Sequence, residues 1–283
     1  MRNLLFILSF VLVTSCQKES TEVPVQPLEA KTIMNVAYGA DVQQKMDVYL
    51  PANRHSDSTK LMILVHGGAW IEGDKSDFDL LVATWKQRLP NYAIANINYR
   101  LATVSAHHFP TQEADLKSAI EFLVQRRGEY QVSQTIVLFG ASAGAHMSLL
   151  QAYKNPSPKI SAVVDLFGPT DMVALWGSIT DPLNQYAMQI LMGGTPTTNP
   201  AMYQQSSPIN FVTAQSPPTI LLHGEKDDLV NIQQSRDLKN KLQSFAVPHE
   251  LVTYPDAGHG DWSPAIFADA ATRVEAFLRK HVP

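Results

Sequence analysis

Residues 135–144 read TIVLFGASAG, and they are the most informative segment for the architecture of this chain. Thr135–Phe139 is an uninterrupted apolar run, as expected for a strand that is buried on both faces of a sheet. Gly140–Gly144 has the pattern G-x-S-x-G, and the helix-compatible Ala145–Tyr153 follows it. On a sharp turn between a buried strand and a helix, such a serine is lifted clear of the sheet. A Gly/Ala-rich turn that only packs tightly is the alternative, but the flanking strand and helix favour Ser142 as a nucleophile.

Similar apolar runs recur on both sides of this stretch, and amphipathic segments separate them. Within Glu113–Arg127 the apolar residues fall on one face of a helix, and Pro264–His281 shows the same pattern. This alternation predicts an α/β fold with a mostly parallel, twisted sheet and helices on both faces. A short turn joins Ile33–Tyr38 to Lys45–Leu50, which predicts an antiparallel hairpin at the N-terminal edge. The predicted strands after this hairpin are Leu61–Val65, Tyr92–Ile97, Thr135–Phe139, Ser161–Phe167, Thr219–Leu222 and Glu250–Tyr254.

The composition excludes several classes of protein. The chain has 283 residues, with 22 Lys and Arg against 26 Asp and Glu, which gives a net charge of −4. Nucleic-acid binding needs clustered Lys and Arg, so that function is excluded. The single cysteine excludes an internal disulfide framework and a CxxC metal site. Residues 31–283 contain no low-complexity linker and no repeat, so one globular domain is expected there.

The N-terminus has the pattern of an export signal. The apolar run Leu4–Val13 is about half as long as the roughly 20 residues that a membrane-spanning helix needs. Residues 13–16, VTSC, resemble a bacterial lipobox. Residues 1–15 are therefore predicted to be a lipoprotein signal peptide, and Cys16 the lipidated first residue of the mature chain. An ordinary secretory signal with an incidental cysteine is the alternative.

Residues 16–30 are predicted to be a flexible tether, because after Cys16 they are polar, contain two prolines and lack periodicity. A lipid anchor at Cys16 would place the protein in the bacterial cell envelope and make the membrane a partner. Gln17 occupies the position where inner-membrane lipoproteins of some bacteria carry Asp, which favours the outer membrane.

Residues 168–216 break the alternation of strands and helices, and they are rich in Pro, Gly, Met and polar residues. Irregular segments of this length are uncommon in compact domains unless they are functional. The segment is either a partial cap over a site or a few surface helices without contact to the substrate.

A serine hydroxyl becomes a good nucleophile only when a base removes its proton. His259 is the best candidate for this base, because it follows the last predicted strand on a glycine-flanked loop. The carboxylate that orients the histidine is expected between the serine and the histidine in the chain. Asp227 and Asp228 both follow the strand Thr219–Leu222, and their spacing leaves open which of them has this role.

The other histidines have simpler interpretations. His66 and His223 lie in HG turns at strand ends, where structural hydrogen bonds are expected. His107 and His108 are adjacent, but no third ligand is spaced to join them, so no metal site is predicted.

The segment His66–Trp70, HGGAW, follows the strand Leu61–Val65 and can supply donors for an oxyanion. Glycine lets backbone N–H groups approach a ligand closely, and losing one such donor typically costs about 3–4 kcal/mol of transition-state stabilisation. Trp70 and Trp262 flank two of the catalytic loops. They either wall an apolar substrate pocket or are ordinary core or surface aromatics.

Together these motifs resemble those of α/β-hydrolase serine esterases. The resemblance is closest to esterases related to hormone-sensitive lipase and to the bifunctional feruloyl and acetyl-xylan esterases. It covers residues 33–281, with the order serine, aspartate, histidine and with HGGAW in place of an HGGG-type oxyanion loop. Further matching pieces are Tyr38-Gly39, Met46–Pro51, Asn98–Leu101, Phe109–Gln112 with Asp115, and Ser207–Ile209.

This resemblance implies roles that the spacing leaves open. The family pattern HGxxDxxVP makes Asp227 the catalytic acid, and the oxyanion donors are the backbone N–H groups of Gly68, Ala69 and Ala143. No metal or organic cofactor is implied. Two residues depart from the pattern: Asn231 replaces the usual proline, and Ala69 replaces the third glycine. The methyl group of Ala69 is expected to narrow the acyl or alcohol pocket.

The expected function is therefore a serine-dependent carboxylic ester hydrolase that works through an acyl-enzyme. Its substrates would be small esters or acylated glycans, such as sugars carrying acetyl or feruloyl groups. An aryl formamidase or amidase on the same fold is the enzymatic alternative. A catalytically inactive binding lipoprotein is an alternative from another class, but such proteins usually lose a member of the triad or the oxyanion loop.

Overall fold

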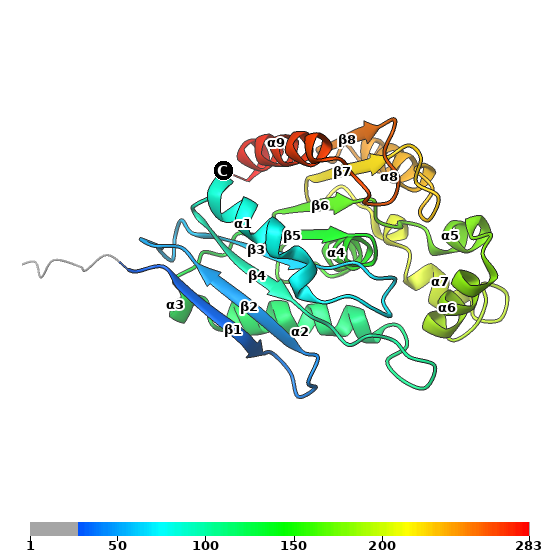
Figure 1. Ribbon diagram of the computed structural model, residues 1–283, viewed down its shortest axis with the longest axis horizontal. Coiled ribbons are helices and arrows are strands. Elements are labelled where there is room, and N and C mark those ends of the chain that lie inside the picture. Colours follow the sequence, from blue (N-terminus) through cyan, green and yellow to red (C-terminus); the bar gives the residue numbers. More distant parts are fainter. Residues whose placement is uncertain (1–27, 283) are drawn as a thin grey trace, which may run out of the picture.

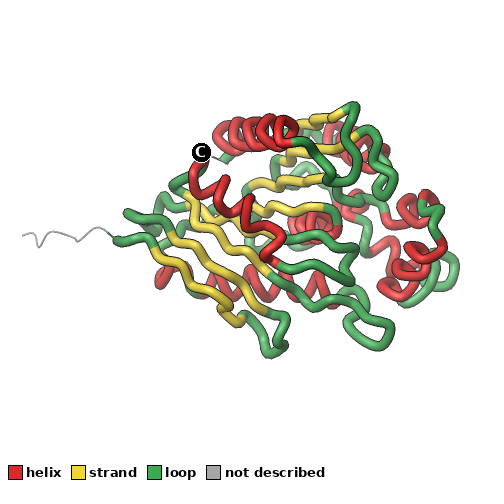
Figure 2. Tube along the Cα trace, in the orientation of Figure 1, coloured by secondary structure: helices red, strands yellow, loops and turns green. Residues whose placement is uncertain are grey.

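The computed structural model describes residues 28–282 (Figure 1). The predicted signal peptide, residues 1–15, and Cys16 lie outside the described residues, as does most of the predicted tether, residues 16–30. The described part of the chain forms an eight-stranded sheet in the order β1-β2-β4-β3-β5-β6-β7-β8, shown in yellow in Figure 2. The strands are β1 Lys31–Ala37, β2 Lys45–Leu50, β3 Lys60–Val65, β4 Tyr92–Ile97, β5 Ile136–Ala141, β6 Ala162–Leu166, β7 Thr219–Gly224 and β8 His249–Tyr254.

The strand directions confirm the predicted fold class. Strands β3 to β8 run parallel to one another, whereas β2 is antiparallel to both β1 and β4. The N-terminal hairpin is therefore the antiparallel edge of a mostly parallel sheet. The register of this hairpin shifts between Ile33 and Val36, where Asn35 has a φ of 55° and its N–H donates to the Asp47 carboxylate at 2.6 Å.

Helices cover both faces of the sheet (Figure 1). Helices α2, α4 and α8 pack on one face, and α1 and α9 pack on the other. No helix within residues 28–282 is both long and apolar enough to cross a membrane. The helices are η1 Lys75–Phe78, α1 Asp79–Arg88, α2 Thr111–Gln125, α3 Arg127–Tyr130, α4 Ala143–Lys154, α5 Met172–Ser178, α6 Pro182–Met192, α7 Pro200–Gln205, η2 Pro208–Phe211, α8 Gln233–Ser244 and α9 Pro264–His281.

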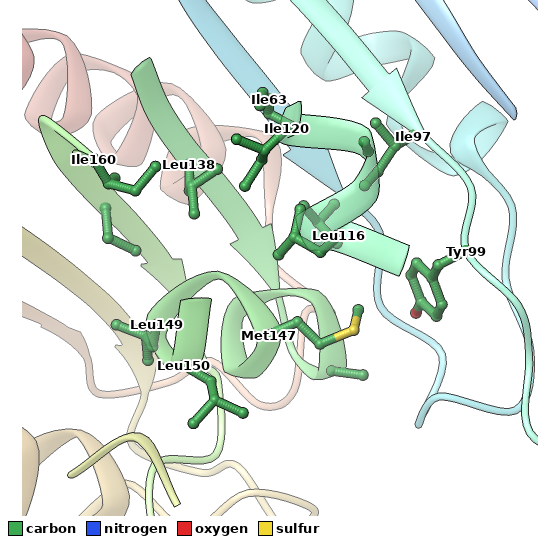
Figure 3. Close-up of a cluster of buried hydrophobic side chains, with 14 of the residues drawn as sticks. Ile63, Ile97, Tyr99, Leu116, Ile120, Leu138, Met147, Leu149, Leu150 and Ile160 are labelled. Carbon is green, nitrogen blue, oxygen red and sulfur yellow. The ribbon is translucent and has the colours of Figure 1, made fainter. Parts of the chain in front are cut away.

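The central strand β3 shows why its sequence is apolar throughout. Successive side chains of a strand point to opposite faces. Leu61, Ile63 and Val65 accordingly join the core beneath α2 and α4, while Met62 and Leu64 join the core beneath α1 and α9. Figure 3 shows part of the first core, in which residues from β3, β4 and β5 meet residues from α2 and α4. Each fully buried side chain of this kind stabilises the fold by about 2 kcal/mol.

Residues 168–216 connect β6 to β7 and contain the short helices α5, α6 and α7 and the turn η2. Two of these helices begin at aspartate caps: the carboxylate of Asp171 accepts from two N–H groups of α5, and that of Asp181 accepts from one N–H group of α6. The segment lies beyond the carboxyl ends of the parallel strands, at the right of Figure 1. It therefore lies at the edge of the sheet where the catalytic loops emerge.

Candidate active site

Ser142 lies on the turn between β5 and α4, with a φ of 52° and a ψ of −119°. This conformation is strained for a residue with a side chain and costs about 1–3 kcal/mol, which the surrounding structure must offset. Glycines make the turn tight enough to form. A Cβ at Gly144 would overlap the backbone carbonyl of Val65 at the end of β3, and a Cβ at Gly140 would overlap the backbone of Gly144. The G-x-S-x-G pattern is thus a steric requirement of this turn.

Neighbouring parallel strands bring a histidine and an aspartate to Ser142. His259 follows β8 and Asp227 follows β7, and the carboxyl ends of these strands meet at one edge. Nε2 of His259 lies 2.9 Å from Oγ of Ser142, and its Nδ1 lies 2.7 Å from Oδ2 of Asp227. Because an ionised carboxylate can only accept, Nδ1 carries the proton and Nε2 is the base that faces the hydroxyl. The three side chains form a continuous hydrogen-bonded chain.

Asp227 is the one of the two adjacent aspartates that faces the histidine. Its Oδ1 accepts from two backbone N–H groups of its own turn at 3.0 and 2.8 Å, and its Oδ2 lies 3.2 Å from Nε2 of His223. Burial by itself raises the pKa of Asp227, but the hydrogen bonds from His223 and His259 outweigh burial and hold this pKa well below its ordinary value. Asp227 is therefore a stable anion. Asp228 is exposed and is one of the residues that line the cavity described below.

The loop after β3 lies beside the nucleophile. A Cβ added to Gly67 would lie 3.3 Å from the Cβ of Ser142, so the two loops touch. Within residues 28–282, the backbone N–H groups of Gly68 and Ala69 have no hydrogen-bond acceptor. Ala143 is the first residue of α4, where the N–H groups lack partners within the helix. All three predicted oxyanion donors therefore lie beside Ser142. Two are on the loop after β3, where they have no acceptor among the described residues, and one is at the start of α4, where it has no partner within the helix.

Tyr99 and His66 hold the carbonyl side of this loop. The O–H of Tyr99 donates to the carbonyl oxygens of His66 and Gly67, at 3.1 and 3.0 Å. Nδ1 of His66 lies 2.7 Å from the Gly67 oxygen, so it donates as well. The two rings stack with their centroids 4.3 Å apart. His66 therefore has the structural role that its HG turn predicts.

A cavity of about 640 Å³ opens over Ser142 at the carboxyl edge of the sheet. Residues 168–216 supply part of its wall, including Leu175, Ile179 and Met188. The lining also contains the acidic residues Glu72, Asp181 and Asp228, but none of the described residues that line it is Lys or Arg. The lining thus combines apolar side chains with exposed acidic residues.

The two candidate pocket tryptophans have different positions. Trp70 lines the cavity, although its side chain is largely buried. Trp262 does not line it: this ring packs against Phe167 and Tyr254 behind the catalytic loop, and its N–H donates to the Gly258 carbonyl at 3.1 Å. Of the two interpretations of Trp262, the core aromatic therefore applies and the pocket wall does not. Its core environment follows from the apolar face of α9 and the end of β8, which meet there.

Phe167 and His223 are site residues whose roles the sequence reasoning missed. Phe167 lines the cavity at the end of β6, and its ring meets the His259 ring edge-on at a centroid distance of 4.7 Å. The sequence does place Phe167 at the carboxyl end of a predicted strand, and this position could have indicated that it lies near the site. His223 was expected to make structural hydrogen bonds, and it does so to the Val230 carbonyl and the Ser235 hydroxyl. Its additional contact with the catalytic acid had no signal in the sequence.

No metal centre is found in the part of the chain that the structure describes, where no group of three or more His, Cys, Asp or Glu side chains is arranged to hold a metal ion. His107 and His108 lie on a loop, and Nε2 of His108 contacts the Thr103 carbonyl at 3.1 Å. The predicted lipidation site, Cys16, lies outside the described residues.

Comparison with known proteins identifies a family and several relatives. The BD-FAE family model matches residues 46–242, which include Ser142 and Asp227. Esterase LipC of Mycobacterium tuberculosis is 26% identical over 245 residues, which are 80% of this chain and 59% of LipC. Kynurenine formamidase of Meyerozyma guilliermondii is 28% identical over 230 residues, which are 75% of this chain and 82% of the formamidase. The chain spans only 49–59% of the length of three mycobacterial relatives.

A solved structure shows the same fold. Bifunctional GH43-CE of Bacteroides eggerthii superposes with a TM-score of 0.75 at 25% identity. The match covers 88% of this chain and 38% of that protein.

Proposed function

The chain belongs to the BD-FAE family, and from this membership and the geometry of the site we propose that it is a carboxylic ester hydrolase with Ser142 as its nucleophile. The observation that carries the proposal is the hydrogen-bonded chain from Ser142 through His259 to Asp227, beside unoccupied backbone donors. An inactive binding protein has no need for a strained serine with an aligned base. The assembled site therefore favours an enzyme over a binding lipoprotein.

The reaction follows from the positions of these groups. Nε2 of His259 takes the proton of the Ser142 hydroxyl as Oγ attacks the ester carbonyl carbon. The carbonyl oxygen becomes an oxyanion and accepts from the N–H groups of Gly68, Ala69 and Ala143. His259 then protonates the departing alcohol, which leaves an acyl group on Ser142. Water deprotonated by His259 attacks this acyl-enzyme and releases the acid.

Hydrolysis of p-nitrophenyl acetate by the purified chain and by its S142A variant would test this function. The wild type should turn over and S142A should lose at least about 10³-fold in kcat, because only the oxyanion donors remain. Equal activity of the two proteins would refute the assignment of the nucleophile.

The alcohol part of the substrate is proposed to be an uncharged sugar that carries an acetyl or feruloyl group. The carboxylates of Glu72, Asp181 and Asp228 can accept hydrogen bonds from hydroxyl groups, and they repel anionic substrates because no lining Lys or Arg offsets them. A solved structural relative contains a carbohydrate esterase part according to its designation, bifunctional GH43-CE. Acetate release should be faster from acetylated xylan than from simple acetate esters. Release that is no faster from xylan would count against a glycan substrate.

An aryl formamidase is the second candidate, and kynurenine formamidase is the relative that favours it. A formyl amide would use the same nucleophile and oxyanion donors, but its leaving group is an amine. N-formylkynurenine and p-nitrophenyl acetate, assayed side by side, separate the two functions. Cleavage of the formyl amide without cleavage of acetate esters would replace the esterase proposal.

We further propose that Cys16 is lipidated and that the domain is displayed at the cell envelope, preferentially at the outer membrane. The direction of β1 supports a site that faces away from such an anchor. Lys31 pairs with Leu50, at the end of the sheet where the parallel strands begin. Ser142 lies at the opposite end, where these strands finish. Six-residue strands separate the two ends by about 20 Å. In Figure 1, β1 starts at the left and α5 to α7 lie at the right.

Metabolic labelling with a tagged fatty acid, followed by membrane fractionation, tests the anchor. The wild type should carry the label and sediment with membranes, and C16S should do neither. A C16S protein that still carries the label would refute lipidation at this residue.

A further inference from the structure

A buried tryptophan–histidine contact connects the oxyanion loop to the helix of the nucleophile. The indole N–H of Trp70 donates to Nδ1 of His146 at 3.2 Å. The His146 side chain is fully buried, and Trp70 is 6% exposed. His146 lies one helical turn after Ser142, and its backbone N–H donates to the Ser142 carbonyl at 3.0 Å. The two residues therefore join the two loops that must meet around a substrate carbonyl.

The neighbours of His146 define its tautomer. An indole N–H can only donate, so Nδ1 must accept and carries no proton. Nε2 lies 2.7 Å from the carbonyl oxygen of Ser206, which can only accept, so Nε2 carries the proton. His146 is consequently a neutral bridge from Trp70 to Ser206. Burial lowers the pKa of His146 to about 4, in agreement with this neutral form.

The far end of the bridge belongs to the segment over the active site. Ser206 directly follows α7, the last α-helix of residues 168–216. The bridge therefore connects three separate elements: the oxyanion loop, the first turn of α4 and the base of the segment that walls the cavity.

The oxyanion loop needs such support because its backbone is unfavourable. Ala69 and Trp70 have φ values of 49° and 63°, a region that residues with side chains adopt rarely and at a cost. A loop of this kind keeps its geometry only where its surroundings hold it. On the backbone, the Trp70 carbonyl accepts from the N–H of Ala102 at 2.8 Å. The Trp70 side chain makes its polar contact with His146.

We propose that His146 is a positioning residue of the oxyanion hole: it holds Trp70, and through Trp70 it keeps the N–H groups of Gly68 and Ala69 aimed at the reacting carbonyl. This inference rests on the proposed esterase function. It predicts an effect in the transition state, where the oxyanion exists, and little effect on binding of the uncharged ester.

The test is a double-mutant cycle on H146L and W70F in the full chain, with p-nitrophenyl acetate as substrate. H146L should lower kcat by about tenfold and leave KM within about twofold, because the donors are displaced rather than lost. The double variant should have nearly the kcat of the less active single variant, because both substitutions remove the same Trp70–His146 contact. H146N should recover part of the loss, because the amide oxygen of asparagine can accept from the indole.

The matched control is Y153F on the same helix. Tyr153 is buried near the other end of α4, and its hydroxyl contacts Thr219 at 2.7 Å, away from the oxyanion loop. Y153F removes one buried hydrogen bond from α4 and should lower the melting temperature without changing kcat. A trifluoromethyl ketone, whose adduct with serine places an oxyanion in the hole, should bind H146L more weakly by the factor lost in kcat.

Three outcomes would overturn the inference. These are a kcat of H146L equal to that of Y153F, losses that multiply in the double variant, and unchanged affinity for the trifluoromethyl ketone. Should H146L fail to fold, W70F with an unchanged kcat would overturn it equally. A wild type that hydrolyses no ester overturns the proposed function and this inference together, whereas an active wild type with unaffected variants overturns this inference alone.

Discussion

At the scale of single residues, the catalytic acid is held from several sides. Asp227 accepts from two backbone N–H groups of its turn, and it contacts His223 and His259. An acid held in this way keeps its orientation while the histidine gains and loses a proton. Its role is to fix the imidazole tautomer and stabilise the imidazolium, which requires a full negative charge.

The D227N variant tests that role. An amide in place of the carboxylate can hold the imidazole in the wrong tautomer, so kcat should fall by about 10⁴-fold. D228N removes an equal charge from the adjacent, exposed residue and should lose far less. Steady-state kinetics of the two variants decides between them. A larger loss in D228N would assign the catalytic role to the other aspartate.

Asp165 on β6 makes the stability of the fold depend on pH. Its carboxyl group is fully buried, Oδ1 accepts from the Gly168 N–H at 2.7 Å, and Oδ2 has no partner. Burial raises the pKa of Asp165 to about 7 from an ordinary value of 3.8. The unfolded chain therefore releases this proton at lower pH than the folded chain, and the stability contribution declines as pH rises from about 4 to about 7.

D165N removes this ionisation. The free energy of unfolding of D165N, relative to the wild type, should increase with pH across that window, by at most about 1.4 kcal/mol per pH unit. Urea unfolding of both proteins at several pH values from about 4 to about 8 measures the difference. A difference that is independent of pH would contradict a buried, protonated Asp165.

At the scale of elements, the close approach of α4 to β3 shapes the nucleophile turn. A Cβ at Gly144 would overlap the carbonyl of Val65, so G144A must push the helix away from the strand. We expect G144A to lose about 1–3 kcal/mol of stability and most of its kcat, since Ser142 moves with the helix. G128A on α3, where an added Cβ meets nothing within 4 Å, is the control and should be neutral or slightly stabilising.

Urea unfolding and p-nitrophenyl acetate kinetics of both glycine variants give the result. A G144A protein as stable and active as G128A would show that the turn tolerates a wider separation of helix and strand.

The elements could be predicted from the sequence wherever a local pattern determined them. The apolar run before Ser142 and the similar apolar runs on both sides of it predicted the buried parallel strands, and the short turn at Gly39 predicted the antiparallel edge. The segment of residues 168–216 was different, because its wall residues come from separate short helices without a shared periodicity. Its three helices are positioned by tertiary contacts, which no local pattern records.

The same distinction applies to the site. Ser142 and His259 follow strands that local sequence reveals, and the structure places them within hydrogen-bonding distance. The choice between Asp227 and Asp228 needed the resemblance to a family, because two adjacent residues after one strand are equivalent by spacing. The bridge from Trp70 through His146 joins residues 76 positions apart in sequence, and only the folded chain reveals it.

At the scale of the whole molecule, the sheet separates the two ends of the domain. The carboxyl ends of the parallel strands, and with them the catalytic loops, lie at one end of the sheet. Strand β1 starts at the opposite end, where the parallel strands begin. A domain attached near β1 would present its cavity outward, to substrates in the surrounding solution. This arrangement agrees with the proposed acylated glycans better than with lipids of the anchoring membrane.

If Ser142 is the nucleophile, an acyl group is attached to it during turnover, and this acyl-enzyme can be trapped and detected. The wild type is mixed with p-nitrophenyl acetate, quenched in acid within the first turnover, digested and examined by peptide mass spectrometry. We predict an acetyl adduct on Ser142 in the wild type, and none in S142A treated in the same way. An adduct on a different residue, or turnover without any adduct in both proteins, would rule out Ser142 as the nucleophile.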